Sequence, residues 1–281
     1  MNYRHDYHAG NFADVVKHVV LARVVTYMMA KPRPFRVIDT HAGAGRYDLL
    51  GPEASKTGEW RDGIGRIFAA HFPPAVTEII EPYLNAVRAV NTTDELKVYP
   101  GSSLIARMIM RPEDVLVANE LNTEEYGRLK RAFGRTKNTT ILNIDARHAV
   151  KSLLPPKERR GVILIDPPFE AKSEFDDLAV AVKEAMARFS AGVYLVWYPL
   201  KDEVAAGRFV AEATRDSSLE FLDVRFSVCA PFPGLGLTAA GLLVLNPPYL
   251  LRNELETLLP YFKDVLSEGI GGGFQLNDRV Q

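Results

Sequence analysis

The 281 residues suffice for one large α/β domain with an insertion or two modest domains, and 47% hydrophobic and 25% charged residues are typical of an ordinary globular protein. A net charge of −1 argues against a protein that coats nucleic acid by bulk electrostatics, and a single cysteine excludes a disulfide framework. The apolar runs are too short to span a bilayer, the first residues do not resemble a signal peptide, and no Cys/His spacing resembles a zinc site, so we expect a cytoplasmic protein without a membrane partner or a metal.

The first predicted element is a helix that begins near residue 12. Apolar residues follow the helical period at positions 12, 15, 16, 19 and 20. Asn11 is a suitable N-cap, and Asp14, Lys17 and His18 share with it a second, polar face. A helix with one apolar and one polar face is expected to turn the polar one toward solvent or toward a site.

Histidines are concentrated near the start of the chain, where His5, His8, His18 and His41 are four of the six. The segment 3–11 also concentrates aromatic, basic and amide side chains. A lone histidine is more often structural, but this clustering favours a functional role for at least two of the four.

Strand-like apolar runs then alternate with helical patterns, which predicts an open, mostly parallel α/β sheet. These runs lie at 35–39, 115–118, 140–144, 162–165 and 193–197, and a helical period covers 175–189. Two further runs, at 221–228 and 241–245, have no helix between them and predict an antiparallel hairpin at one edge of the sheet. The glycine-rich segment 269–273 is expected to be mobile.

The segment 51–94 interrupts this alternation because it is too long for an ordinary crossover. Helical patterns occur at 60–72 and 76–90. We therefore expect residues 51–94 to form an inserted helical subdomain, and residues 1–50 and 95–281 to form the core.

A glycine-rich turn, residues 39–45, follows the first predicted strand, where backbone around Gly43 can approach a ligand. The dinucleotide fingerprint fails because Asp48 occupies the position of its third glycine, and no phosphate-binding Gly-Lys-Ser/Thr follows. Taken alone, the turn is equally compatible with a purely structural role.

Four successive predicted strands end in acidic residues, namely Asp39, Glu120, Asp145 and Asp166. Since the carboxyl ends of parallel strands meet at one sheet edge, we expect these carboxylates to converge. Glu120 stands where a ribose would present two hydroxyls, and Asp145 where an adenine amino group could donate. The acidic set suits a nucleoside cofactor without phosphates, such as S-adenosylmethionine, and would repel the pyrophosphate of NAD.

Asp166-Pro167-Pro168-Phe169 follows the fourth of these strands. The exocyclic amino group of a planar base is a poor nucleophile because its lone pair is delocalised into the ring. The Asp166 carboxylate and the Pro167 carbonyl could accept its hydrogens, while Phe169 offers a face for stacking. A strand that ends in a proline turn is the plainer alternative.

A similar motif, Asn246-Pro247-Pro248-Tyr249, follows the last predicted strand. It lies outside the four-strand series, so we expect a structural turn there. Two basic stretches are candidates for contact with a nucleic acid, although such runs are more often solvated surface: Arg128, Lys130, Arg131, Arg135 and Lys137, and then Lys157, Arg159 and Arg160.

Together these motifs resemble the RlmJ family of 23S ribosomal RNA adenine-N6 methyltransferases. The likeness runs nearly end to end, through the blocks at 3–5, 8–11, 13–15, 17–18, 39–47, 99–102, 159–161, 164–168, 197–199 and 246–248. It implies a Rossmann-like S-adenosylmethionine-dependent methyltransferase sheet with a helical subdomain that coincides with residues 51–94.

The resemblance also implies roles for individual residues. S-adenosylmethionine would be bound by His18, His41, Ser102, Glu120 and the Asp145-Ala146 pair, with S-adenosylhomocysteine as the product. Asp166 would engage the target amino group, and Tyr3, His5 and Lys17 would close over the adenine or assist its chemistry. Phe169 stands where many members carry tyrosine, and Ala146 where members can carry glycine.

We therefore expect direct methyl transfer to an exposed adenine in 23S ribosomal RNA, with protein-free RNA as the substrate of a monomeric enzyme. Methylation of DNA adenine or of a protein glutamine poses the same electronic problem and stays open as an enzymatic alternative. A non-catalytic RNA-binding protein on the same fold is the alternative of a different class.

Overall fold

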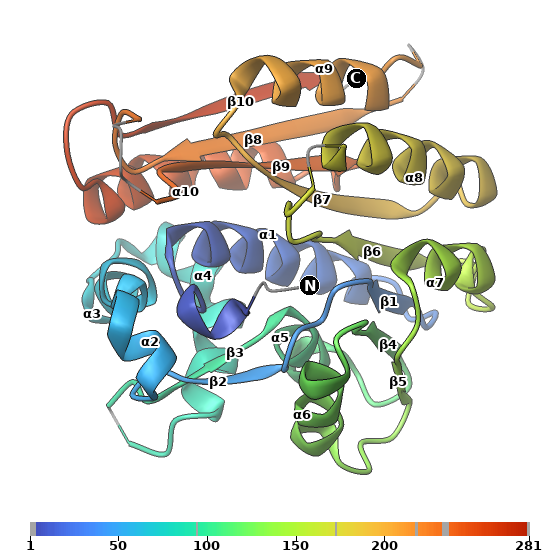
Figure 1. Ribbon diagram of the computed structural model, residues 1–281, viewed down its shortest axis with the longest axis horizontal. Helices are drawn as coiled ribbons and strands as arrows, with labels where there is room; N and C mark the ends of the chain where they lie inside the picture. Colours follow the sequence, from blue (N-terminus) through green and yellow to red (C-terminus); the bar gives the residue numbers. More distant parts are fainter. Residues whose placement is uncertain (1–3, 94, 172, 217–218, 232–235, 280–281) are drawn as a thin grey trace.

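The computed structural model describes residues 4–93, 95–171, 173–216, 219–231 and 236–279. Its centre is an eight-stranded sheet with the order β10-β8-β9-β7-β6-β1-β4-β5 (Figure 1). The strands are β1 (Arg36–Asp39), β4 (Val115–Asn119), β5 (Thr139–Leu142), β6 (Gly161–Ile165), β7 (Val193–Pro199), β8 (Phe221–Ser227), β9 (Ala239–Leu245) and β10 (Gly273–Arg279). The five strands from β7 to β5 are parallel, as the sequence predicted.

The other end of the sheet differs from the prediction. β8 and β9 form the expected antiparallel pair, but β9 inserts between β7 and β8, so this pair is not the edge. The edge strand is β10, which pairs with β8. The segment 269–273, expected to be mobile, forms the turn that leads into β10, and the Ala230 amide donates to the Ile270 carbonyl there. The strand was missed because only Phe274 and Leu276 give it an apolar alternation.

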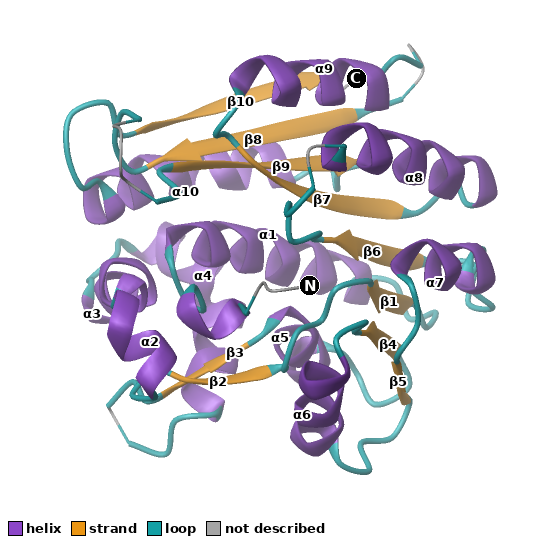
Figure 2. Cartoon of the chain, viewed as in Figure 1, coloured by secondary structure: helices purple, strands orange, loops and turns teal. Residues whose placement is uncertain are grey.

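Helices cover both faces of the sheet (Figure 2). Alternate residues of each strand point to opposite sides, so Val162 and Leu164 join one hydrophobic cluster and Ile163 and Ile165 the other. The first cluster includes residues of α1 (Phe12–Met29), α4 (Pro74–Ala89), α5 (Ser102–Ile109), α6 (Thr123–Phe133) and α10 (Leu251–Leu266), and the second includes residues of α7 (Ala146–Leu153), α8 (Glu174–Arg188) and α9 (Glu203–Ala213). None of the helices in the described residues is long and apolar enough to cross a membrane.

Helix α1 begins as predicted, because the Asn11 side chain caps it by accepting from the Asp14 amide. Its polar face is buried as thoroughly as its apolar one. Asp14 and Lys17 are only 2% and 4% exposed, and His18 1%. The polar face therefore lines an interior site, and the buried charges need partners there.

The segment 51–94 contains α2 (Pro52–Thr57), the π-helical turn η2 (Arg61–Gly65), α3 (Arg66–Ala69) and α4. A small sheet of β2 (Arg46–Asp48) and β3 (Val98–Pro100) flanks it. Its apolar side chains, among them Ile64, Ile67 and Ile80, belong to the same cluster as α1. The segment thus shares the core of the sheet instead of having one of its own.

The amino-terminal residues are held against this segment by two glycines. The Ile64 amide donates to the Gly10 carbonyl at 2.8 Å. A β-carbon on Gly63 would lie 2.1 Å from that carbonyl oxygen, a distance that no side chain tolerates. The short helix η1 (His5–Tyr7) packs against α2, and its His5 side chain reaches Asp14 in the first turn of α1.

Candidate active site

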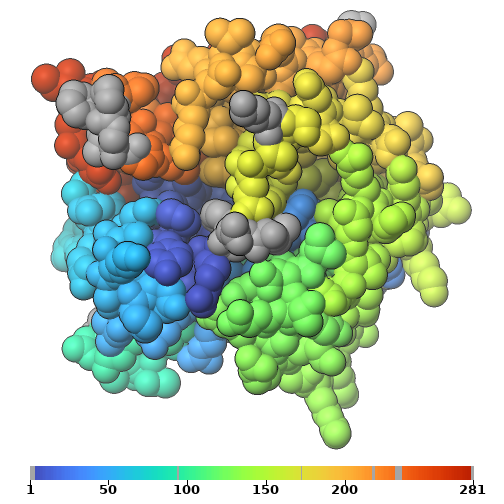
Figure 3. Space-filling model, in the orientation of Figure 1, coloured from blue at the N-terminus to red at the C-terminus, as the bar shows by residue number. Residues whose placement is uncertain are grey.

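A cavity of about 510 Å³ lies at the carboxyl ends of the parallel strands. Figure 3 views the face on which the amino-terminal segment (dark blue) meets the parts of the chain that follow β4 (green) and β6 (yellow). The cavity lining includes all the described residues that were nominated for catalysis, cofactor binding or contact with the adenine: His5, Lys17, His18, His41, Gly43, Ser102, Glu120, Asp145, Ala146, Asp166, Pro167 and Phe169. The strand-end carboxylate Asp39 is not part of this lining. Tyr3 lies outside the described residues.

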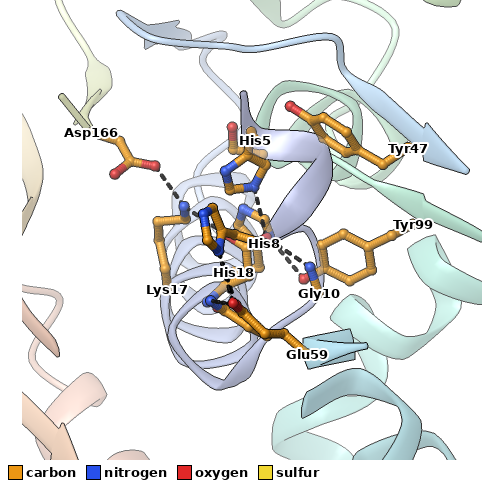
Figure 4. Close-up of polar contacts among 12 residues, drawn as sticks. His5, His8, Gly10, Lys17, His18, Tyr47, Glu59, Tyr99 and Asp166 are labelled. Carbon is orange, nitrogen blue, oxygen red and sulfur yellow. Dashed lines mark hydrogen bonds and ion pairs between the residues drawn. The ribbon is translucent and has the colours of Figure 1, made fainter. Parts of the chain in front are cut away.

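Asp166 leaves β6 beside Lys17 of α1. The Lys17 Nζ donates to the Asp166 Oδ2 at 2.5 Å, although 149 residues separate them. Figure 4 shows the lysine extending from α1 toward the carboxylate. Of the two side chains, Lys17 is 5% and Asp166 17% exposed, so the carboxylate is the partner that reaches the cavity space.

Phe169 has a positive φ of 51°, which bulky residues rarely adopt. Its ring contacts Phe175 edge-on at 4.9 Å between centroids and Trp197 at 5.9 Å. These two rings fix Phe169 at the cavity wall beside Asp166. Trp197 of β7 follows Val196, the partner of Ile165, and so lies next to Asp166. Its buried Nε1 has no hydrogen-bond partner among the described residues.

Behind Lys17 lies a second carboxylate, Asp14. Lys17 Nζ is 2.8 Å from the Asp14 Oδ1, and His5 Nε2 is 2.9 Å from Oδ2. Burial would lower the pKa values of His5 and Lys17, but Asp14 overcomes this effect and raises both. The pKa of Asp14 is held well below its usual range by these cations in spite of burial.

His18 and His41, unlike His5, are kept neutral by burial. Burial lowers the pKa of His18 to about 3 and that of His41 to about 4. The Thr40 hydroxyl donates its single proton to the Leu164 carbonyl, so it must accept from the His41 Nδ1. The His41 Nε2 is therefore unprotonated and can accept a hydrogen bond. The His18 Nδ1 lies 2.7 Å from the Tyr99 hydroxyl.

The glycine turn is tied to the end of β4. The Gly43 amide donates to the Glu120 Oε2 at 2.8 Å, and the Asn122 amide donates to Oε1 at 2.8 Å. Each carboxylate oxygen keeps a second lone pair for a ligand hydroxyl. Burial raises the pKa of Glu120 above its usual range, in spite of these bonds.

Ser102 begins α5 and donates to the Asp39 Oδ2 at 2.6 Å. Asp39 is 1% exposed, and burial raises its pKa to about 7. Asp145 has another role, since its Oδ1 caps α7 by accepting from the Arg147 and His148 amides. The cavity-lining backbone at Ala146 is therefore held by the carboxylate that precedes it.

The two basic stretches do not line the cavity. Arg128 instead forms ion pairs with Asp6 at 2.6 Å and Glu125 at 3.0 Å. Arg160 donates to the carbonyls of Met28 and Arg33, at the amino ends of the parallel strands and thus away from the cavity. Neither arginine is a free surface charge, because buried backbone or carboxylate groups nearby require a donor.

Asn246 forms a structural turn, as predicted. Its amide nitrogen donates to the carbonyls of Ser190 and Gly192, both at 2.7 Å. Because β9 runs antiparallel to β7, this turn lies where the parallel strands begin, whereas Asp166 lies where they end.

The sequence did not single out several residues of the lining, among them Trp197, Tyr47, Glu59 and Lys201. The strand-end rule extended to β7 would have found Trp197. Glu59 accepts from His8 and Asn11, each at 3.0 Å, and this grouping depends on how the segment 51–94 folds back. No local pattern indicates it.

The donor set fits S-adenosylmethionine. Carboxylates at two adjacent strand ends, Glu120 and Asp145, can accept from nucleoside hydroxyl and amino groups, and the turn at Gly43 brings backbone into the cavity. The described lining contains two lysines, Lys17 and Lys201, and no arginine. Lys17 is already paired with two carboxylates. In the described lining, the carboxylates beside the glycine turn therefore favour a cofactor without phosphates.

Comparison with known proteins places the chain in a family. Residues 32–280 match the family model described as "RsmJ: Ribosomal RNA large subunit methyltransferase D, RlmJ". Ribosomal RNA large subunit methyltransferase J from Escherichia coli is 36% identical over 266 residues, 95% of this chain and 94% of that protein. The protein of the same name from Haemophilus influenzae is 37% identical over 273 residues, 96% of each.

A crystal structure of protein LPL1258 from Legionella pneumophila superposes with a TM-score of 0.87 at 30% identity, covering 96% of this chain and 98% of that one. This chain therefore matches these relatives in sequence and in fold over nearly its whole length. The glycine turn, the strand-end carboxylates and the Asp166 turn all lie within the matched residues. This chain belongs to the RlmJ family of ribosomal RNA large subunit methyltransferases.

Proposed function

We propose that this protein transfers a methyl group from S-adenosylmethionine to the N6 nitrogen of one adenine in 23S ribosomal RNA. The observation that carries the proposal is the Asp166 carboxylate at the end of β6, in the same cavity as the glycine turn. Membership of the family supports ribosomal RNA as the acceptor.

The cofactor occupies the part of the cavity that the glycine turn and the ends of β1, β4 and β5 enclose. Backbone at Gly43 and Ala146 and the carboxylates of Glu120 and Asp145 hold its nucleoside. His18, His41 and Ser102 contact the remainder; the neutral state of both histidines avoids repulsion of a sulfonium. When bound, S-adenosylmethionine supplies an electrophilic methyl group.

The acceptor adenine lies on Phe169. Its amino group donates to the Asp166 carboxylate and to the Pro167 carbonyl, so the nitrogen lone pair is aimed away from the ring plane. Asp166 then accepts the proton that the methylated nitrogen loses. Lys17 and His5 line the cavity. We propose that, with Tyr3, they close over the base or assist its chemistry.

An adenine reaches this position only when it is unpaired and unstacked, so the substrate is a loop or a single-stranded segment. With a net charge of −1, local contacts must guide the RNA. We propose protein-free 23S ribosomal RNA as the substrate, a monomer as the active form, and residues 51–94 as a helical subdomain of the enzyme.

Replacement of Asp166 tests the proposal. Asp166→Ala is expected to lower methyl transfer by about 10²–10⁴-fold. The replacement removes the carboxylate that accepts the hydrogen bond of the amino group and that later accepts its proton. Affinity for S-adenosylmethionine, measured by calorimetry, should stay within about threefold of the original, a difference of less than 1 kcal/mol. Asp166→Asn should be less severe, since an amide still accepts. Asp176→Ala, at an exposed position of α8, is the control.

The acceptor is identified by radiolabelled transfer to 23S ribosomal RNA that lacks the modification, followed by nucleoside mass spectrometry. Label in N6-methyladenosine is the expected result. Label in DNA adenine or protein glutamine would favour the enzymatic alternatives, and cofactor binding without any transfer would favour a non-catalytic RNA-binding protein. Full activity of Asp166→Ala would overturn the assignment of that residue.

A further inference from the structure

We propose that Asp14 is a positioning residue for methyl transfer. Its buried carboxylate neutralises the Lys17 ammonium, so that Asp166 retains a net negative charge for the amino group of the adenine. The inference rests on the proposed function and adds to it a residue that does not touch the reacting atoms.

The contacts of Asp14 leave little freedom for another role. Its Oδ1 accepts from Lys17 at 2.8 Å, and its Oδ2 accepts from His5 at 2.9 Å and from the Gly10 amide at 2.9 Å. The residue is 2% exposed. One carboxylate thus holds the lysine, the imidazole of η1 and the backbone that enters α1.

Charge balance gives these contacts their consequence. Lys17 is 2.8 Å from Asp14 and 2.5 Å from Asp166, so one ammonium serves two carboxylates. With Asp14 present the three groups carry one net negative charge, and Asp166 is the member with the greater exposure to the cavity. Without Asp14 the same lysine would neutralise Asp166 fully and weaken it as an acceptor.

Other ionisable groups face this centre from neighbouring elements. His5 of η1 contacts Asp14, and His18 of α1 lies close enough to interact with it. Asp39 of β1 interacts with both Asp166 and Lys17, and His41 with Asp166. Burial keeps His18 and His41 neutral at pH 7, so Lys17, Asp14 and Asp166 dominate the charge of the centre. Beside them lie Asp39, whose pKa burial raises to about 7, and His5, whose pKa Asp14 raises in spite of burial.

A scaffold role is the alternative, because Asp14 also holds Gly10 and His5. A double-mutant cycle with Lys17 separates the two roles. If Asp14 acts through the charge of Lys17, its replacement matters only while the lysine is present. If Asp14 is a scaffold for η1, the loss should be similar in both backgrounds.

The experiment compares the full chain with Asp14→Asn, Lys17→Gln and the double variant, using radiolabelled transfer to unmodified 23S ribosomal RNA at varied concentrations of S-adenosylmethionine. Asp14→Asn is expected to lower kcat by about tenfold or more, the effect of at least 1.4 kcal/mol on the barrier. The KM for S-adenosylmethionine should stay within about threefold of the original value, because the charge of Asp166 acts on the amino group of the acceptor and not on the cofactor. In the Lys17→Gln background, Asp14→Asn should change kcat by less than about twofold.

The matched control is Asp223→Asn. Asp223 of β8 is also 1% exposed and binds the Tyr198 hydroxyl and the Arg225 guanidinium, but it lies three strands from β6. Its replacement should cost stability and leave the kcat of the folded chain unchanged. The double variant contains neither buried charge, so it should fold even if Asp14→Asn does not. In that case the kcat of the double variant, compared with that of Lys17→Gln, tests the inference.

Equal losses in the two backgrounds, or a loss in Asp14→Asn that appears in KM with kcat unchanged, would overturn the inference. Its failure is distinct from failure of the proposed function. The proposed function fails if the original chain transfers no methyl group to adenine, whereas the inference fails when the original chain is active and the two replacements act independently.

Discussion

Gly43 has a backbone φ of +56°, and a β-carbon there would lie 2.1 Å from the Tyr47 hydroxyl oxygen. That hydroxyl accepts from the Ala44 amide, so it cannot move without loss of a hydrogen bond in the turn. The glycine is thus required twice, once by its conformation and once by its neighbour.

Gly43→Ala is therefore expected to weaken S-adenosylmethionine binding at least tenfold, about 1.4 kcal/mol, as measured by calorimetry. Tyr47→Phe in the same chain removes the clashing oxygen and should recover part of the affinity, with the left-handed strain of about 1 kcal/mol remaining. Unchanged affinity in Gly43→Ala would contradict a role for this turn in cofactor binding.

His18 makes stability depend on pH. Its pKa is about 3 in the folded protein against 6.5 ordinarily, so it contributes stability above pH 6.5 that is lost progressively as pH falls toward 3. Between pH 7.5 and 5 this loss is about 2 kcal/mol, at about 1.4 kcal/mol for each unit below 6.5.

His18→Gln cannot titrate and should lack this part of the pH dependence. Urea unfolding of both chains at pH 7.5 and pH 5 measures it as the difference between the two losses, in which the other ionisable groups cancel. Parallel losses in the two chains would mean that His18 is accessible to protons in the folded state.

At the scale of elements, the η1 helix reaches the cavity because Arg128 of α6 binds Asp6 of η1. This ion pair is largely buried, with 25% and 10% of the side chains exposed. Its removal should cost more than the usual surface pair, because a buried carboxylate is left without its main partner.

Arg128→Met is expected to destabilise η1 by about 1–3 kcal/mol. The readout is amide hydrogen exchange at His8 and Ala9, which donate to the His5 carbonyl. Asp6→Asn added to Arg128→Met should restore protection. Arg147→Met, which breaks a half-exposed pair with Asp177, is the control and should change stability by less than about 1 kcal/mol.

The parallel strands could be predicted from sequence because β4, β6 and β7 carry continuous apolar runs, and β1 and β5 each contain a pair of adjacent apolar residues. β10 could not, since its alternation contains only Phe274 and Leu276, and the order β8-β9-β7 is not encoded in any single segment. Strand order is decided by which edges remain available once β6 and β7 have paired.

For the whole molecule, β10 protects the edge of the sheet. It pairs with β8 along seven residues, from Gly273 opposite Ser227 to Arg279 opposite Phe221. Without it, β8 would present unpaired backbone groups to other chains.

A chain that ends at residue 267 is expected to unfold about 5 °C lower or more and to associate, as seen by calorimetry and light scattering. Methyl transfer per folded molecule should be retained, because β8, β9 and β7 separate β10 from the strands that end at the cavity. A chain shortened only by residues 280–281 is the control. A monomeric truncated chain with unchanged Tm would show that β10 has no such role.

The sequence alone determined the elements that carry chemistry: the glycine turn, the acidic ends of four strands and the Asp166 turn. It did so because strand ends and turns are local patterns, and because parallel strands necessarily bring their carboxyl ends together. Tertiary structure alone decided that Lys17 meets Asp166 across 149 residues and that Trp197 stands beside them. It also decided that Arg128 serves Asp6 instead of facing solvent. Such pairings depend on the packing of α1, η1 and α6 around one cavity, and no local pattern specifies distances between segments so far apart in the chain.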